Sequence, residues 1–139
     1  MKNNLQSIFI VILLIITCEM NYSQIIDQNE KWVKVADGLN FPEGPAFDGK
    51  SSICLSNCYG GWITLFSEGV KDTFISKADD SLLIENTNGL AFGFDGNLYV
   101  CEDGSKAKIL RISCDGKIEV YSDGYKGEKF NRPNDLTFD

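Results

Sequence analysis

The sequence predicts an all-β protein that is built from repeated antiparallel sheets. A short phrase, in which an oxygen-bearing side chain precedes a small-apolar-aromatic run, occurs at residues 43–48, 88–93 and 134–139. The phrase recurs about every 45 residues, a period that indicates propeller blades or another repeat array. Short β-branched or aromatic runs, separated by Asp-Gly, Gly-Gly and Glu-Gly turns, lie between the copies. No stretch after residue 24 has a helical period.

Residues 1–23 are predicted to be an export signal. Lys2 gives a positively charged start, and the unbroken apolar run from Ile8 to Ile16 is too short to span a bilayer. We expect cleavage between Ser23 and Gln24, with a lipid anchor at Cys18 as the alternative. The mature protein, residues 24–139, is therefore expected to be exported, to the periplasm or the extracellular space, without a transmembrane span.

Residues 24–40 are expected to lead into the first repeat. Residues 32–36 alternate between apolar and polar side chains as a strand does, before the Asp37-Gly38 turn. In a closed propeller such a strand can pair with the last blade.

Two complete units follow, each with four predicted strands. The first unit, about 43–77, has strands at 44–47, 52–57, 62–66 and 72–76, and the second, about 88–122, has strands at 89–94, 97–101, 108–112 and 117–121. A third unit is expected to start with a strand at residue 134. Four strands in about 45 residues indicate a β-propeller blade. Because a ring of blades needs at least about four of them, we expect the sequence to be part of a longer protein or a truncated product.

The composition argues against several classes of function. A net charge of −7 with no basic run makes nucleic-acid binding a poor hypothesis. The absence of histidine excludes Ser-His-Asp and Cys-His nucleophile systems, and also the usual His-rich zinc and copper sites. Any metal ion would be held by carboxylate, amide and carbonyl oxygens, which favours a hard cation such as calcium or magnesium.

Four cysteines lie outside the predicted signal: Cys54, Cys58, Cys101 and Cys114. Their spacing does not match a paired zinc site. We expect each to be a buried free thiol, with a disulfide of undetermined pairing as the alternative in an exported protein.

The first residues of the three phrases are Glu43, Asn88 and Asn134, and they are candidate functional residues. If the units stack around an axis, these side chains fall at equivalent places around it and could form a ring of oxygen ligands. Alternatives stay open at each position. Glu43 could cap a turn, Asn134 could start an Asx-turn, and Asn88 could be a turn residue or line the channel.

Two further charged motifs have simpler interpretations. Arg132 precedes the third phrase and could contact a ligand or only pair with a surface acid. The adjacent acids Glu102 and Asp103 are predicted to lie in a hairpin loop and to be solvated.

Two motifs together resemble a known family. Glu43-Gly44-Pro45 opens the first unit, and the run 131–135, preceded by Tyr125-Lys126-Gly127, opens the third. From about Trp32 to Asp139 the chain resembles the N-terminal part of the SMP-30/gluconolactonase family. This resemblance implies a six-bladed β-propeller, of which the sequence holds two blades and the start of the third. It also implies one divalent cation near the mouth of the central channel.

The resemblance also implies roles for individual residues. Glu43 matches a metal-binding glutamate, and Arg132 and Asn134 match residues of the substrate pocket, with Asn134 close to the metal. Asn88 is a looser match. The predicted metal ligands are therefore Glu43 and Asn134, and the predicted substrate-binding residues are Arg132, Asn134 and Asn88. The family's remaining ligands and its acid–base aspartate are expected beyond residue 139, so the catalytic residue stays unknown.

The predicted function is that of a metal-dependent lactonase, a carboxylic ester hydrolase that opens a small sugar-acid lactone or a related ester. A cation, with Ca²⁺ expected and Zn²⁺, Mg²⁺ or Mn²⁺ as alternatives, would polarise the carbonyl that water attacks. Arg132 could offer a forked donor to a hydroxyl or carboxylate of the ligand. The alternatives are a non-catalytic propeller that binds a ligand or protein, and an inactive truncated remnant.

Overall fold

The computed structural model describes residues 31–79 and 83–139. Residues from Val35 to Asp139 form one compact unit, and the description below concerns that unit. The predicted export signal, its cleavage site and Cys18 lie outside the described residues. Within the described part of the chain, no helix has the length and apolarity needed to cross a membrane.

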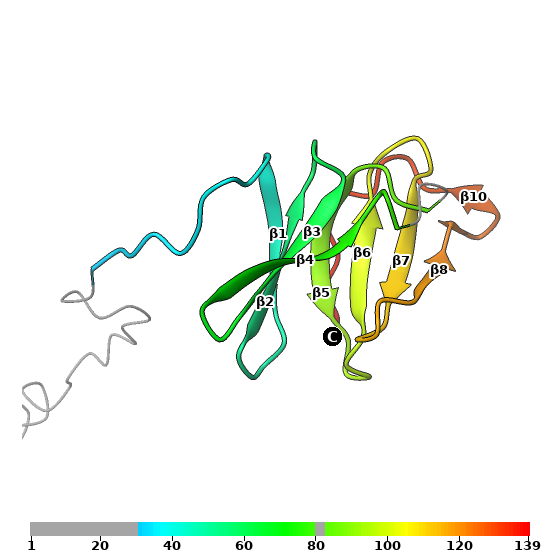
Figure 1. Ribbon diagram of the computed structural model, residues 1–139. Helices are drawn as coiled ribbons and strands as arrows, with labels where there is room; N and C mark the ends of the chain where they lie inside the picture. The colour runs from blue at the N-terminus through cyan, green and yellow to red at the C-terminus, as the bar shows by residue number, and fades with distance from the viewer. Residues whose placement is uncertain (1–30, 80–82) are drawn as a thin grey trace, which may run out of the picture. The chain divides into compact units, whose positions relative to one another are not determined.

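The unit consists of two four-stranded antiparallel sheets that follow one another along the chain (Figure 1). The first sheet contains β1 (Pro42–Phe47), β2 (Ser52–Asn57), β3 (Trp62–Ser67) and β4 (Val70–Ser76), in that order. The second contains β5 (Thr87–Phe92), β6 (Leu98–Glu102), β7 (Lys108–Ile112) and β8 (Ile118–Ser122), again in order. Consecutive meandering sheets of this kind confirm the predicted all-β, propeller-type fold.

Three segments differ from the strand prediction. Residues 32–36 form no strand, because alternation alone does not supply the neighbouring edge that a ladder requires. The segment from Asn134 to Asp139 also forms no strand, although it lies against β5. A small hairpin that was not predicted, β9 (Gly124–Tyr125) with β10 (Glu128–Lys129), follows the second sheet.

The hydrophobic core lies between the two sheets. On β6 and β7 the buried residues Leu98, Val100, Leu110 and Ile112 alternate with residues on the opposite face, as the two-residue period of a strand requires. The first sheet, the connection between the sheets and β5 contribute the remaining buried members: Ala46, Cys54, Ile63, Ile75, Ile84 and Leu90. Each fully buried aliphatic side chain of this kind contributes about 1.5–3 kcal/mol.

The innermost strands of the sheets approach each other so closely that only glycine fits between them. A Cβ added at Gly44 would lie 2.5 Å from the carbonyl oxygen of Asn88, and the φ of Gly44 is +51°. A Cβ added at Gly89 would lie 2.6 Å from Cα of Asp135 and 2.7 Å from the carbonyl oxygen of Asn134. The three copies of the phrase therefore pack in succession, the first on the second and the second on the third.

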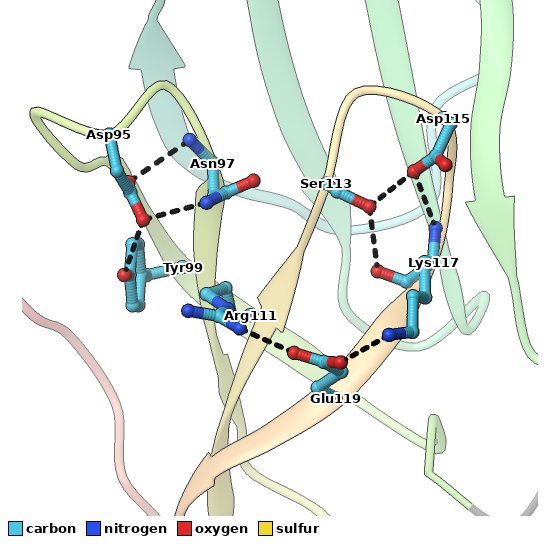
Figure 2. A network of polar contacts seen from close by, with 8 residues as sticks. All are labelled: Asp95, Asn97, Tyr99, Arg111, Ser113, Asp115, Lys117 and Glu119. Carbon is cyan, nitrogen blue, oxygen red and sulfur yellow. Dashed lines mark hydrogen bonds and ion pairs between the residues drawn. The ribbon is translucent and has the colours of Figure 1, made fainter.

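Side chains brace the opposite, hairpin end of the second sheet (Figure 2). Asp95, in the turn after β5, accepts a hydrogen bond from the Tyr99 hydroxyl at 3.0 Å. Glu119 on β8 pairs with Lys117 at 2.6 Å and also with Arg111 on β7. Hydrogen bonds and charge from Lys117, and then from Arg111, lower the pKa of Glu119 from 4.5 to about 2.

The four described cysteines are free thiols, but not all are buried. Cys54, Cys58 and Cys101 are buried, whereas Cys114 is exposed, so its predicted burial is wrong. Cys114 lies between β7 and β8, where the chain turns at the edge of the core. Burial raises the pKa of Cys54 to about 11 and that of Cys101 to about 12.

Candidate functional site

The three residues that open the phrases lie on neighbouring backbone segments. Ser56, which pairs with Glu43 across β1 and β2, donates a side-chain hydrogen bond to the carbonyl oxygen of Asn88 at 2.6 Å. The N–H of Gly89 donates to the carbonyl oxygen of Asn134 at 2.8 Å. Hydrogen bonds thus connect the second phrase to the third phrase directly and to the strand that pairs with the first phrase.

Both sheets carry the same irregularity at the phrase. The pairing register shifts between Glu43 and Ala46 in the first sheet, and between Thr87 and Leu90 in the second. A β-bulge of this kind changes the direction of the side chains beside it and is frequent near functional sites. The repetition supports equivalent roles for Glu43 and Asn88.

The third phrase begins with the same backbone conformation as the first. Phe41 and Arg132 each precede a proline, and their φ values are +54° and +55°. Because a left-handed conformation costs a residue other than glycine about 1–2 kcal/mol, its recurrence at the same place indicates equivalent constraints. Arg132-Pro133-Asn134 therefore corresponds to Phe41-Pro42-Glu43. The backbone conformation shows this correspondence, although the side chains of Phe41 and Arg132 differ.

The three predicted residues differ in accessibility. Asn88 is 8% exposed, Glu43 is half-buried, and Asn134 is exposed. The structure thus brings their backbones together without enclosing their side chains in one cavity. Their roles as metal ligands or substrate-binding residues stay predictions.

Arg132 forms an ion pair with Asp103. Its Nε donates to Oδ1 of Asp103 at 3.1 Å and its Nη2 donates to Oδ2 at 3.2 Å. The side chain of Arg132 is 72% exposed and that of Asp103 only 10%. The hydrogen bonds with Asp103 raise the pKa of Arg132 further above its ordinary value.

A pocket of about 460 Å³ lies beside this ion pair. It is lined by Asn86, Asp103, Gly104, Ser105, Ala107, Phe130, Asn131 and Arg132. Arg132 therefore pairs with a buried acid and also lines a pocket, and its contact with a substrate stays a prediction. Glu43, Asn88 and Asn134 are not among the lining residues.

The adjacent acids Glu102 and Asp103 are buried, so the prediction that they are solvated is wrong. Glu102 pairs with Thr87 at the end of β6, and its Oε1 accepts the N–H of Asn86 at 2.8 Å. Its Oε2 is buried without a hydrogen-bond partner. The Asp103-Gly104 dipeptide indicated an exposed loop. Strand pairing instead buries Glu102, and the N–H of Asp103 is held by the carbonyl oxygen of Asn86.

Asn57 in the first sheet has the same role as Glu102 in the second. Asn57 ends β2, and its Oδ1 accepts the N–H of Asn40 at 2.8 Å. Each sheet therefore uses a buried side-chain oxygen at the end of its second strand to fix the chain that enters its first strand. Glu102 and Asn57 occupy the same position of the two units, and a comparison of the units at this position could have predicted that Glu102 is buried.

Acidic groups gather around Cys58, which directly follows β2. Burial, and then the negative charges of Asp103 and Glu43, raise the pKa of the Cys58 thiol. The N–H of Cys58 donates to the carbonyl oxygen of Phe41 at 3.1 Å, and the ring of Phe41 stacks on that of Tyr59 at 4.4 Å. Glu43, Asp103 and this exposed aromatic pair thus lie at one end of the sheets.

The donor groups of Glu43 and Asn134 could contribute to a cation site but do not complete one. The carboxylate of Glu43 and the amide oxygen of Asn134 are ligands of the type that Ca²⁺ prefers, but Ca²⁺ takes about six to eight oxygens. Within residues 31–79 and 83–139, no group of three or more His, Cys, Asp or Glu residues could hold a metal ion. The chemistry of these residues fits calcium, and their number requires further ligands.

The fold and this arrangement of inner strands define the class of protein as a β-propeller. No protein-family model matches the chain. A segment of 52 residues, 37% of the chain, is 38% identical to a protein of Zymomonas mobilis named gluconolactonase and covers 15% of that protein.

Two solved structures are similar over most of the chain. One is a gluconolactonase of Xanthomonas campestris, with a TM-score of 0.63 and 28% identity over 73% of this chain. The other, a gluconolactonase candidate, has a TM-score of 0.67 and 23% identity over 81% of this chain, and it supports the fold alone. The chain spans 33% and 37% of these two proteins, respectively. The matches confirm the resemblance to SMP-30/gluconolactonase proteins that the two motifs indicate.

Proposed function

We propose that this chain is part of a lactonase of the gluconolactonase type, which hydrolyses a sugar-acid lactone or a related ester. The observation that carries the proposal is the equivalence of Phe41-Pro42-Glu43 and Arg132-Pro133-Asn134, which lie on the inner segments at either side of the second phrase. It places one acid and one amide at matching positions of a fold shared with gluconolactonases. The proposal concerns the longer protein, because this chain spans only part of its relatives.

Glu43 and Asn134 are the residues that we assign to a divalent cation, with Ca²⁺ favoured by their oxygen donors. When bound, the cation would supply Lewis-acid polarisation of a carbonyl group. Arg132 lies at the edge of the 460 Å³ pocket, where its N–H groups can donate to hydroxyl oxygens of a ligand. The buried Asn88 contributes to the wall between the first and third phrases.

The test is lactone hydrolysis by the full-length protein, with and without added calcium and after treatment with a chelator. We expect activity on a sugar-acid δ-lactone to require the cation. Glu43→Gln should lower kcat/KM by about 10²–10³-fold, the range for loss of a major electrostatic contribution. Glu128→Gln, on the exposed β10, is the matched control and should leave kcat/KM unchanged.

Two results would contradict the proposal. Unchanged turnover by a folded Glu43→Gln variant would remove this carboxylate from the site. Binding of lactones or sugar acids without any hydrolysis would favour the non-catalytic ligand-binding propeller.

A further inference from the structure

We propose that Asp103 is a positioning residue that fixes the Arg132 guanidinium and cancels its charge, so that the site accepts a neutral lactone and disfavours the anionic acid. This inference rests on the proposed function. It assigns a role to Asp103, which belongs to neither of the two motifs that resemble the family. It also specifies that the ligand at Arg132 is neutral and carries hydroxyl groups.

The geometry of the ion pair supports the positioning role. Asp103 engages one edge of the guanidinium through two nitrogens, Nε at 3.1 Å and Nη2 at 3.2 Å, and its carbonyl oxygen also accepts from Nε at 3.4 Å. A forked pair of this kind fixes the plane of the guanidinium as well as its position. The Nη1 group takes no part in the pair and keeps its donors for a ligand.

Asp103 is the fixed partner in this pair. It is 7% exposed, and its N–H donates to the carbonyl oxygen of Asn86 at 2.8 Å. Arg132, in contrast, has a largely exposed side chain, whose many rotamers would otherwise be populated. The orientation of the guanidinium is therefore set by Asp103.

The charges around the pair disfavour an anion. The carboxylate of Asp103 balances the guanidinium charge, and Glu102, which is not assigned to the cation, adds a further acidic group near Cys58 at the same end of the sheets. A carboxylate ligand would have to displace Asp103 or approach these acids. A hydroxyl or ring oxygen needs only a donor, and Nη1 provides two.

This selection distinguishes the substrate of lactone hydrolysis from its product. Water adds its hydroxyl to the carbonyl carbon, the bond from that carbon to the ring oxygen breaks, and the ring oxygen takes the remaining proton. The carboxylic acid then loses a proton to solvent at neutral pH, so a neutral ring becomes an anion. Charge cancellation at Arg132 would weaken the binding of this product and favour its release.

The experiment compares the full-length wild type with Asp103→Asn and Asp103→Glu at one calcium concentration. We measure KM and kcat for the lactone and the inhibition constant of the corresponding sugar acid. Asp103→Asn frees the arginine charge and should tighten inhibition by the acid about tenfold, equivalent to about 1.4 kcal/mol. It should also raise KM for the lactone more than it lowers kcat. Asp103→Glu restores the charge and should return acid inhibition toward the wild-type value.

A double variant, Asp103→Asn with Arg132→Gln, tests whether the tighter inhibition by the sugar acid comes from the arginine charge. The gain in acid binding should vanish in it, because the free guanidinium is gone. Unchanged inhibition by the acid in a folded Asp103→Asn variant would overturn the proposal, as would equal changes for acid and lactone.

Two further measurements keep the proposal testable. If Asp103→Asn does not fold, Arg132→Gln replaces it and should change lactone and acid affinity by the same factor. A selective loss of acid affinity would then overturn the proposal. If the wild type hydrolyses no lactone, the proposed function fails. Charge cancellation at Arg132 is then tested on its own, by comparing the calorimetric affinity of wild type and Asp103→Asn for the sugar acid. No tighter binding by the variant would overturn it.

Discussion

The close approach of the inner strands predicts that Gly44 tolerates no side chain. Gly44→Ala introduces a Cβ 2.5 Å from the Asn88 carbonyl oxygen and 2.7 Å from Cα of Gly89, both backbone atoms that cannot rotate away. Overpacking of this kind costs about 1–3 kcal/mol, and the left-handed φ of +51° adds about 1–2 kcal/mol. The expected loss in the free energy of unfolding is therefore about 2–5 kcal/mol.

Gly49→Ala separates the two contributions. Gly49 also has a left-handed φ, +78°, but a Cβ there meets nothing within 4 Å. Gly49→Ala should lower the free energy of unfolding only through the left-handed conformation, by about 1–2 kcal/mol. Urea unfolding of both variants should give midpoints that differ on the order of 1 M. Equal midpoints would refute the direct contact between the first two phrases.

Two other predictions follow from the titratable groups. Because the pKa of Glu119 is lowered from 4.5 to about 2, the stability that its ion pairs contribute is present above pH 4.5 and is lost as the pH falls toward 2. The difference in urea midpoint between wild type and Glu119→Gln should therefore shrink over this range, and a constant difference would contradict the pairing. A maleimide at neutral pH should label Cys114 in the folded protein and leave Cys54 and Cys101 unlabelled until urea is added. Labelling of either buried thiol at the rate of Cys114 would contradict the assigned burial.

The strands were predictable because their signals are local. Asp-Gly and Gly-Gly turns separate alternating runs, and the loop at Asp115-Gly116 joins β7 to β8 as predicted. The lead-in at residues 32–36 carries the same alternation and forms no strand, because a strand also needs a partner that the pattern does not encode. The small β9–β10 hairpin was missed because two-residue strands carry too little pattern.

The candidate site was only partly predictable. The repeated phrase predicted that Glu43, Asn88 and Asn134 occupy the same position in each unit, and their backbones do lie on neighbouring segments, but their roles stay predictions. The burial of Asp103 was missed, since its N–H contacts the carbonyl oxygen of Asn86 and its side-chain partner Arg132 lies far along the chain. The equivalence of Phe41 and Arg132 is a property of the backbone that their different side chains hide.

The most direct test of the account is a crystal structure of the full-length protein with bound calcium. The account predicts a cation in contact with a carboxylate oxygen of Glu43 and the amide oxygen of Asn134. A cation bound elsewhere, with the side chains of Glu43 and Asn134 directed away from each other, would contradict it.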